Sequence, residues 1–545
     1  MKRTTRLLIS DDRGDGRVSS AGCLDLEDAG LQAEAEARDA LAAVRSLVGA
    51  QQLARAADLA RDALATPLHP SDRIRFALVL SDVLFNLGDT VQSMAVAGWV
   101  LHEPELPESS CAAAQVGMAG VLLAQDDVDG ARTIAESLLS GDSRAGDAGV
   151  PSAIGILAFI AWREGRTADA MGMLRATARR QAQRERVPSR HHTMLGLAVM
   201  LTATGDFDGA AAVIDAARDD IARSDGTWVA APAILRGRLY LAAGRPQAAA
   251  DLARAGVAAA DLGARILVPL ARLLWAQCAL LRGDVDEASR QVRGFRAAPV
   301  SGRILFASGS YTYTEARLAA EQCGPERAIE ILADTYDDPS GSKQLFMEEP
   351  GAAAWLVRTA LSVGDSDRAA AVAACMTQLA ADNRNETSLV AAAAHASGVL
   401  GKDPASLLLA AAAHVHPWAS ASAREDAGEA LAARCDASAA RDALEQTQHQ
   451  YVAVGAERDA ARVRRRLRRL ASLRNGRPVS GWTALTSTER RVARVVAEGL
   501  SNPQVGKRLF LSRHTVDFHL RQIFRKLSIH SRVELTRYVI ECDPN

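Results

Sequence analysis

The chain has 545 residues, and its 64 Lys and Arg residues nearly balance its 65 Asp and Glu residues. A chain of this length is too long for a single hydrophobic core, so we expect several domains or an array of repeats. Aromatic residues make up only 4%, and long Ala- and Leu-rich stretches with helical spacing predict an all-α fold. Seven scattered cysteines without a Cys-x-x-Cys pair, and no signal peptide or apolar run of membrane length, predict a reduced, cytoplasmic chain outside the membrane.

Residues 1–25 are predicted to form a flexible tail. Within them, Leu7 to Asp12 resemble the first strand and acidic pair of a response-regulator receiver domain. Helical repeat sequence begins by about residue 30, however, which leaves no room for a phosphate-accepting domain. A loose tail is therefore the interpretation that we favour.

Residues 26–470 carry an internal repeat of about 39 residues, with ten turns spaced 37 to 41 residues apart. Each unit joins an apolar helix, through a turn residue that is usually Gly, to a second helix with a small residue in its first turns. Small residues at that position let the paired helices approach closely. The ten pairs of turn residue and small residue are Gly49/Ala54, Gly88/Ser93, Asp126/Ala131, Gly165/Ala170, Gly205/Ala210, Gly244/Ala249, Gly283/Ala288, Gly324/Ala328, Gly364/Ala369 and Gly401/Ser406.

This pattern resembles the tetratricopeptide class, with a period slightly longer than the usual one of about 34 residues. The resemblance implies helix pairs stacked into a superhelix, whose concave groove suits a peptide, a partner protein or a small ligand. We therefore expect a protein or small-molecule effector on the repeat groove. Four tryptophans fall within repeat helices and are expected in the core rather than facing a ligand: Trp162, Trp228, Trp275 and Trp355.

The end of the chain is basic. Residues 461–545 hold 19 basic and 6 acidic side chains, whereas the remainder holds 45 and 59. This asymmetry suggests a nucleic-acid-binding end on an acidic body. The arginine-rich run 462–469 is either a solvated face of the last repeat helix or a supplementary phosphate contact. Residues 471–480, which include Asn475 to Pro478, are predicted to be a linker that acts as a hinge.

Residues 481–545 predict four short helices, each opened by its own capping residue. In the third helix Val516, Leu520, Ile523 and Leu527 recur at helical spacing, and the opposite face is polar and basic. A short helix, a tight turn and a helix of this kind predict a helix-turn-helix. The expected caps, each with the residue three positions later, are Thr486 with Glu489, Ser501 with Gln504, Ser512 with Thr515, and Ser531 with Glu534.

This segment resembles the LuxR-type helix-turn-helix domain. The resemblance implies a four-helix DNA-binding unit, bound as a homodimer to a two-fold site in double-stranded DNA, at the end of a bacterial transcription regulator. RNA polymerase is a further candidate partner. The residues that match are Leu485, Thr486, Glu489, Val492, Ala497, Gly499, Ser501, Asn502, Val505, Leu509, Leu511, Ser512, Thr515, Val516, His519, Ile523, Lys526, Leu527 and Arg532.

Within this domain Arg521 is the foremost candidate for reading a base, since Arg offers two parallel donors to guanine. Thr515, Lys526 and Arg532 are expected to contact phosphates. Phe518 either touches a thymine methyl group or packs against a neighbour. The full expected DNA-binding set is Thr486, Asn502, Ser512, Arg513, Thr515, Asp517, Phe518, Arg521, Gln522, Arg525, Lys526 and Arg532. The fourth helix either braces the third or dimerises, through Val533, Leu535, Val539 and Ile540.

Three residues depart from the LuxR pattern. Thr488 stands where Arg is frequent, and Gly506 stands where Ala is common. Asp517 replaces a common Lys, Arg or Asn, so it either accepts from a cytosine amino group or weakens binding to DNA.

Nothing in the sequence predicts an enzyme, a cofactor or a metal site. The large LuxR-type regulators related to the maltose-regulon activator, which the repeats also resemble, carry an ATPase, but this sequence has no Gly-(x)4-Gly-Lys-Ser/Thr motif. Residues 340–343, Ser-Gly-Ser-Lys, are predicted to be a turn. The histidine pairs 191/192 and 414/416 lack nearby metal ligands. A DNA-binding regulator is thus predicted, and the competing hypothesis is a repeat scaffold whose terminal domain mainly dimerises.

Overall fold

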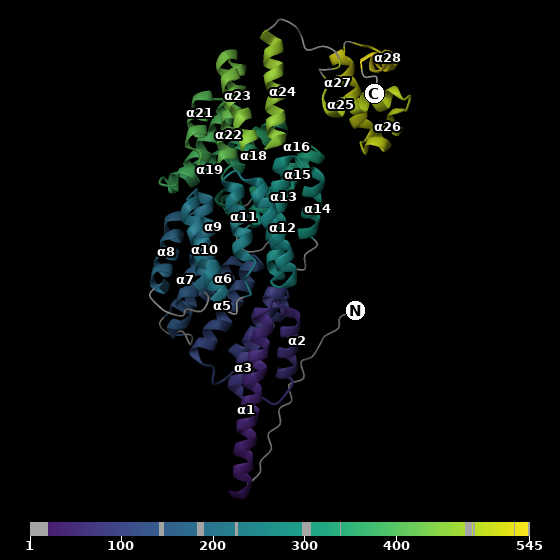
Figure 1. The fold of residues 1–545 in the computed structure, drawn as a ribbon. Helices are drawn as coiled ribbons and strands as arrows, with labels where there is room; N and C mark the ends of the chain where they lie inside the picture. Colours follow the sequence, from purple (N-terminus) through teal and green to yellow (C-terminus); the bar gives the residue numbers. More distant parts are fainter. Residues whose placement is uncertain are drawn as a thin grey trace. The chain divides into compact units, whose positions relative to one another are not determined.

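The computed structural model describes residues 20–140, 146–182, 190–223, 227–296, 307–337, 339–474, 482, 485–527 and 529–542. Every regular element in these ranges is a helix, which confirms the predicted all-α fold (Figure 1). The chain forms two compact units, residues 1–423 with 453–456, and residues 424–452 with 457–545. No helix in the described ranges combines the length and the apolar character needed to cross a bilayer.

The first unit is built from successive helix pairs joined by short turns, the arrangement of tetratricopeptide-like repeats. An additional helix, α17 (Pro339–Glu348), lies between two pairs, and α22 (Pro417–Ala433) runs from the first unit into the second. The pairs are α1 (Ser20–Gly49) with α2 (Leu53–Leu64), α3 (Pro70–Leu87) with α4 (Thr90–Leu101), α5 (Glu108–Ala124) with α6 (Val128–Leu139), α7 (Val150–Arg163) with α8 (Thr167–Ala182), α9 (Arg190–Thr204) with α10 (Phe207–Arg223), α11 (Ala231–Ala242) with α12 (Pro246–Leu262), α13 (Val268–Arg282) with α14 (Val285–Arg296), α15 (Ser308–Gln322) with α16 (Pro325–Asp337), α18 (Ala352–Ser362) with α19 (Ser366–Asp382), and α20 (Thr387–Gly401) with α21 (Pro404–Ala413).

The turn inside each pair contains a residue with left-handed backbone, which glycine adopts most readily. Eight of the predicted turn residues have positive φ: Gly88, Asp126, Gly165, Gly205, Gly244, Gly283, Gly324 and Gly364. In the first and last pairs α1 and α20 continue through Gly49 and Gly401, so the left-handed residues are Gln51 (φ 59°) and Lys402 (φ 51°) instead.

Small residues lie where the two helices of a pair meet. From Ser93 to Ala369, all eight predicted small residues are at most 1% exposed. Ser93 also exchanges hydrogen bonds with Ser81 of the preceding helix, since each hydroxyl donates to the other residue's carbonyl at 2.8 and 3.0 Å. Ala54 is exposed, because the shifted first turn places Ala56 at the buried position.

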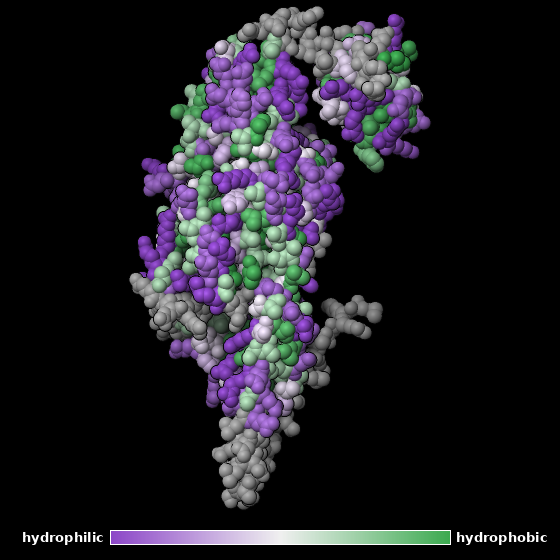
Figure 2. Space-filling view, viewed as in Figure 1, coloured by the Kyte–Doolittle hydropathy of each residue, from purple (hydrophilic) through white to green (hydrophobic). Residues whose placement is uncertain are grey.

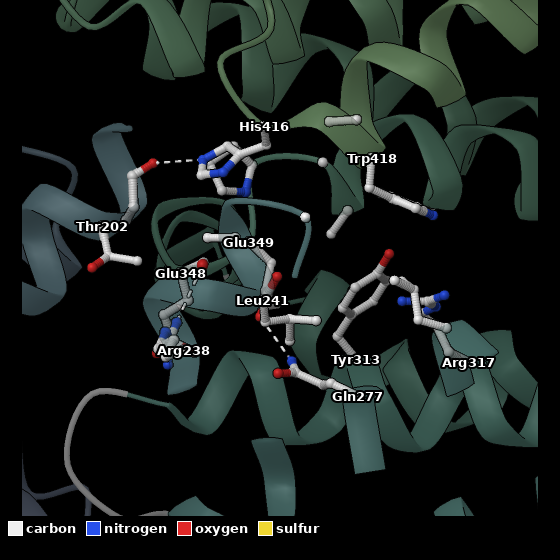
Figure 3. Close-up of a pocket in the computed structure, with 18 residues that line it drawn as sticks. Thr202, Arg238, Leu241, Gln277, Tyr313, Arg317, Glu348, Glu349, His416 and Trp418 are labelled. Carbon is white, nitrogen blue, oxygen red and sulfur yellow. Dashed lines mark hydrogen bonds between the residues drawn. The ribbon is translucent and has the colours of Figure 1, made fainter. Parts of the chain in front are cut away.

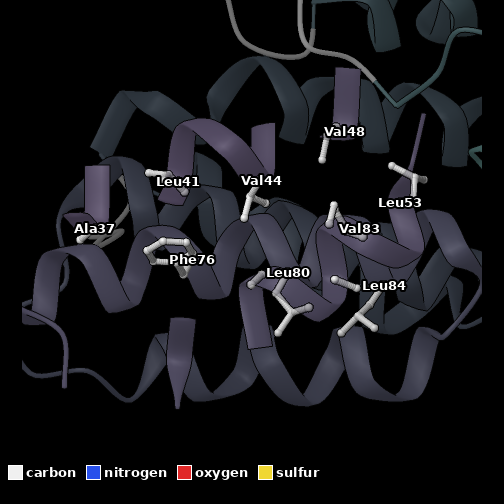
Figure 4. Packing of buried hydrophobic residues seen from close by; sticks show 12 residues of the cluster. Ala37, Leu41, Val44, Val48, Leu53, Phe76, Leu80, Val83 and Leu84 are labelled. Atoms are coloured by element: carbon white, nitrogen blue, oxygen red, sulfur yellow. The ribbon is translucent and has the colours of Figure 1, made fainter. Parts of the chain in front are cut away.

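The cores of neighbouring pairs are continuous. Figure 4 shows Val44 of α1, Leu53 of α2 and Phe76 of α3 packed in one cluster, and all three are at most 1% exposed. Of the repeat tryptophans, Trp162 is buried, whereas Trp228, Trp275 and Trp355 are half-buried. On the face shown in Figure 2, hydrophilic and apolar side chains are interspersed over the repeats.

Repeats far apart in sequence also contact each other within the first unit. Asn383, after α19, donates to Gly165 O at 2.6 Å and accepts from the Thr167 amide at 3.1 Å. In the next layer Ser388 Oγ donates to Thr204 O at 2.9 Å. The superhelix is therefore held by contacts across more than 180 residues as well as by contacts between adjacent pairs.

The second unit contains the end of α22, then α23 (Ala437–Ala453) and α24 (Glu457–Arg474). The chain then continues to the C-terminal helices α25 (Ser487–Ala497), α26 (Asn502–Leu509), α27 (Arg513–Leu527) and α28 (Arg532–Cys542). A separate apolar cluster joins these last four helices. Its fully buried members include Val492, Val496, Val505, Val516, Ile523 and Leu535.

Some predictions fall at segment boundaries. Residues 1–19 of the expected tail and 475–480 of the expected linker lie outside the described residues, while α1 begins at Ser20 and α24 runs to Arg474. The predicted turn at residues 340–343 is wrong, because it forms the beginning of α17. Pro339 opens that helix, where its missing amide costs little, and Leu345 and Phe346 anchor it in the core.

Candidate nucleic-acid interface

The beginnings of α25 to α28 are fixed by the four predicted capping residues. Without a cap, the first turn of each helix leaves backbone amides unpaired. A capping side chain stabilises the helix by about 1 kcal/mol. The bonds are Glu489 N to Thr486 Oγ1 (3.1 Å), Ser501 N to Gln504 Oε1 (2.8 Å), Thr515 N to Ser512 Oγ (3.1 Å) and Glu534 N to Ser531 Oγ (3.2 Å). Thr486, Ser512 and Ser531 thus accept from first-turn amides, as their sequence positions predict. At Ser501 the bond runs the other way, from the serine amide to the side chain of Gln504.

A tight turn joins α26 to α27. Phe510 adopts a left-handed backbone with φ 57°, and its side chain is 96% exposed. The Leu511 amide donates to Gly506 O at 2.8 Å. A Cβ added at Gly506 would lie 2.6 Å from Leu511 O. The close approach of the turn's backbone to α26 thus accounts for the glycine at position 506.

Helix α27 has one buried and one exposed face. Val516, Leu520, Ile523 and Leu527 are buried, as their spacing predicts. The opposite face exposes side chains that include Phe518, which is 57% exposed and makes an edge contact with His519. Three exposed arginines share this face at intervals of eight and four residues: Arg513, Arg521 and Arg525. Within the described ranges no carboxylate forms an ion pair with any of them, and Arg525 donates to Gln522.

Asp517 belongs to a chain of hydrogen bonds that ties three helices together. Its carboxylate accepts from Asn502 Nδ2 at 2.5 Å, and Asn502 Oδ1 accepts from Arg532 Nη1 at 2.8 Å. Arg532 Nη2 donates in turn to Leu500 O. The carboxylate therefore has a partner inside the domain, and Asn502 is oriented from both sides.

Glu489 forms a second internal brace. Its carboxylate is 5% exposed and accepts from Lys526 Nζ at 2.6 and 2.7 Å and from the Thr486 amide at 2.7 Å. Burial alone would raise the pKa of Glu489, but the bonds from Lys526 and Thr486 and the ammonium charge hold that pKa below its ordinary value. The pair links α25 to the end of α27.

The geometry described above agrees with the comparison to known families. Residues 483–539 match the family described as bacterial regulatory proteins, luxR family. These residues form a LuxR-type helix-turn-helix domain.

Individual relatives match short stretches of this chain. One stretch of 59 residues is 54% identical to an HTH-type transcriptional regulator of Mycobacterium tuberculosis H37Rv, and it covers 11% of this chain and 7% of that protein. A stretch of 53 residues is 49% identical to a nitrate/nitrite response regulator protein homologue of Haemophilus influenzae, and it covers 10% of this chain and 26% of that protein. The chain thus spans only a small part of the length of these relatives.

The similarity of the fold to solved structures is weak. A Rap protein complexed with Competence and Sporulation Factor aligns over 74% of this chain and 98% of that one, with a TM-score of 0.37 and 11% identity. A TM-score this low carries no argument about function.

The LuxR-type domain assigns internal roles to several residues that were expected to contact DNA. Lys526 and Arg532, which were expected on phosphates, both donate to groups of the domain itself in this structure. Thr486 and Ser512 cap helices by accepting from the amides of Glu489 and Thr515. Asn502 and Asp517 bind each other. Arg513, Phe518, Arg521, Gln522 and Arg525 remain on the outward side of α27.

The four residues considered for dimerisation also divide into two groups. Leu535 is fully buried and Val539 is 7% exposed, because both complete the core of the LuxR-type domain. They brace α27 and are not available to a second subunit in this structure. Val533 and Ile540, by contrast, are 79% and 68% exposed, and their separation of seven residues places them on one face of α28.

The arginine run before the domain likewise has two faces. Buried Glu425 accepts from Arg462 Nε at 2.8 Å and from Tyr451 OH at 2.8 Å, and Arg466 also donates to it. These inner arginines hold α24 against α22. The outer arginines are all exposed: Arg464, Arg465, Arg468 and Arg469.

Proposed function

We propose that this chain is a sequence-specific DNA-binding transcription regulator. The observation that carries the proposal is the outward face of α27, where three arginines stand together without an acidic partner among the described residues. In a helix-turn-helix this face enters the major groove. A cationic face of this kind supplies the sequence-independent attraction to phosphates on which specific contacts are added.

The roles within α27 follow from chemistry and exposure. Arg521 pairs with the O6 and N7 of a guanine, since its guanidinium offers two parallel donors. Phe518 touches a thymine methyl group, in keeping with its exposed ring. Arg513 and Arg525 contact phosphates, and Gln522 hydrogen-bonds a base or orients Arg525. Asp517 positions Asn502 at the beginning of α26 and does not itself face a phosphate.

Two further surfaces extend the binding. The outer arginines of α24 add phosphate contacts beside the specific site, where burial and the neighbouring positive charges already lower the pKa of Arg465. An anion would relieve that repulsion. Twelve residues separate Arg474 from Ser487, and such a segment spans at most about 43 Å, so α24 can reach DNA that flanks the domain. Val533 and Ile540 form the contact of a homodimer on a two-fold site.

The repeat unit senses an effector in this proposal. Its stacked helix pairs offer groove surfaces to a protein or a small molecule. The effector alters the access of the LuxR-type domain to DNA in a cytoplasmic, non-enzymatic regulator. RNA polymerase is the further partner when the bound chain regulates transcription.

The proposal is tested by incubating the full chain with randomised duplex DNA at two salt concentrations and sequencing the bound fraction. We expect a two-fold motif, with an affinity that falls steeply as salt rises. If no sequence is enriched at either salt concentration, while circular dichroism shows folded protein, the regulator proposal is wrong and a dimerising scaffold becomes the better explanation.

A further inference from the structure

A cavity of about 130 Å³ lies within the first unit, among the ends of helices from five different repeats. Its walls come from α9, α11, α13 and α15, from the end of α17, and from residues at the beginnings of α18 and α22 (Figure 3). The cavity combines aromatic and ionisable side chains, of which Arg238, Arg317, Glu349 and Trp418 matter most here. Pockets with this mixture are the ordinary form of small-molecule sites.

Arg317 is held flat by aromatic rings. Its guanidinium carbon lies 5.6 Å from the centre of the Tyr313 ring and 5.2 Å from that of Trp418. Stacking on ring faces leaves the in-plane N–H groups of a guanidinium available for hydrogen bonds. No carboxylate of the described residues forms an ion pair with Arg317. Arg317 is therefore a positioned cation whose N–H groups can donate to an anion such as a carboxylate.

Glu349 supplies an acceptor in the same cavity. One carboxylate oxygen, Oε1, accepts from Gln277 Nε2 and from Ser310 Oγ, both at 2.9 Å. These bonds fix the carboxylate, while its Oε2 receives no hydrogen bond from any residue that the structure describes. Figure 3 shows Glu349 and Gln277 joined in this way within the cavity. A ligand with a hydrogen-bond donor could bind to Glu349 Oε2.

The other titratable groups of the cavity differ in how far they are hydrogen-bonded. The neighbouring Glu348 accepts from the Ser310 amide at 2.7 Å and from Gln344 Nε2 at 2.8 Å, and burial raises the pKa of its carboxyl. Arg238 donates to the backbone oxygen of Glu348 at 3.4 Å. His416 donates to Ala203 O at 3.1 Å, and burial lowers its pKa, so it is neutral near pH 7. Arg238 has further donors, but it lies close enough to Glu348 to lower the pKa of that carboxyl against the effect of burial. Arg317 is left as the cation without an ion-pair partner, and Glu349 Oε2 as an acceptor without a hydrogen bond, among the described residues.

Arg317 and Glu349 are both partly buried in the wall of this cavity. Among the described residues the cation has no ion-pair partner and the anion is only partly hydrogen-bonded, so one molecule that carries both opposite functions would pair with each of them. We infer that the cavity binds a small amphoteric acid, whose carboxylate pairs with Arg317 and whose amino or hydroxyl group donates to Glu349. The volume limits the enclosed part to about the size of benzene or a small amino acid. The inference names the ligand class for the proposed sensing role of the repeats.

The test measures thermal unfolding of the full chain with each of the twenty L-amino acids, with lactate, with propionate and butyrate, and with inorganic phosphate. We expect at least one amino acid or lactate to raise the unfolding midpoint with increasing concentration, as a ligand of the native state must. Propionate and butyrate lack the second function and should bind at least tenfold more weakly. Stabilisation by phosphate alone would identify a simple anion site and overturn the amphoteric class, and so would the absence of any shift.

Two variants assign the contacts for the ligand that binds. Arg317→Gln should weaken its binding at least tenfold, and Arg317→Lys should restore part of it because the charge is kept. Glu349→Gln should weaken the amphoteric ligand but leave propionate unaffected. Arg327→Gln, at an exposed ion pair on α16, is the matched surface control and should change nothing. Equal binding to the wild type and both cavity variants would overturn the inference.

Failure of the ligand site can be distinguished from failure of the proposed DNA-binding function. DNA binding of the same proteins is measured without added ligand. Loss of ligand binding with intact sequence-specific DNA binding removes only the ligand site. A ligand that binds through Arg317 to a chain without specific DNA binding would support the cavity and remove the regulator proposal.

Discussion

At the scale of single residues, the LuxR-type domain shows how one helix divides its polar side chains between two tasks. On α27, Asp517 and Lys526 bind partners on other helices, whereas Arg521 is left exposed. The first two hold α27 in place, and the third is the residue proposed to read a base. The effects of substituting them should therefore differ in kind, with lost stability for the internal residues and lost recognition for the exposed one.

Arg521→Ala should weaken binding to the selected DNA site by about 1–3 kcal/mol and relax sequence choice at one base pair. The physical reason is the loss of two parallel hydrogen bonds to guanine. Competition binding against unrelated duplex DNA measures the effect, with Arg327→Ala in the first unit as the control. Unchanged specific and non-specific binding would show that Arg521 does not read a base.

Lys526→Met should destabilise the LuxR-type domain by about 1–3 kcal/mol at pH 7, because it leaves the buried Glu489 carboxylate without its cation. The pKa of Glu489 is lowered in the folded chain. The stabilisation is therefore fully present above the unfolded-state value of about 4.3 and is lost as pH falls through the lower folded-state pKa. The difference between wild type and variant should shrink in that acidic range.

Amide hydrogen exchange in α25 and α27 gives the local opening free energy at each pH. Lys507→Met, at an exposed position on α26, is the control and should leave exchange unchanged. A difference that stays constant down to pH 3 would contradict the assigned ion pair.

At the scale of elements, a few residues decide where a helix ends and which of its faces is buried. The turn between α26 and α27 is set by one close approach, at Gly506, and by one left-handed residue, Phe510. Helix α24 is set by the two faces of its arginine run, with Arg462 turned inward and Arg465 outward. Spacing along a helix predicts that two faces exist, but the position of Glu425 decides which arginines become structural.

Gly506→Val should destabilise the LuxR-type domain by about 1–3 kcal/mol, because a branched side chain cannot fit where a Cβ already lies 2.6 Å from Leu511 O. Hydrogen exchange in α26 and α27 measures the loss. Lys507→Val adds a similar side chain at the next, exposed position and should have little effect. If amide hydrogen exchange in α26 and α27 is the same in the two variants, the close approach at Gly506 does not limit the size of the side chain there.

Replacing the four outer arginines of α24 with Gln should make DNA binding less dependent on salt. Each lost phosphate contact removes about 0.9 from the slope of log affinity against log salt, so we expect the slope to fall by about 1–4. The matched control replaces the same four residues with Lys, which keeps the charges. An unchanged slope in the Gln variant would assign this face to solvent.

At the scale of the whole molecule, the repeats do more than stack on their neighbours. The turns of α7/α8 and α9/α10 hydrogen-bond to groups around α19 and α20, through Asn383 and Ser388. The cavity lies among five repeats for the same reason. A local change at one of these contacts should therefore affect the stability of the first unit beyond its own pair.

Asn383→Ala should destabilise the first unit by about 2–4 kcal/mol, because it leaves the buried Thr167 amide and Gly165 carbonyl without their partner. Thermal unfolding followed by circular dichroism measures the change. Arg384→Ala, at the next and exposed position, serves as the control. If both variants unfold at the wild-type temperature, the contact between distant repeats contributes nothing to stability.

The sequence by itself determined the helices, the turns and the terminal domain, because caps, left-handed turn residues and apolar spacing act over a few neighbouring positions. It predicted eight repeat turns at the right residue, and it missed those at Gln51 and Lys402 by two and one positions because a helix can continue through glycine. Only the tertiary structure decided which polar residues turn inward, as Lys526 and Arg532 do. Only it brought Arg317 and Glu349 into one cavity, because those contacts depend on how distant repeats pack and not on local spacing.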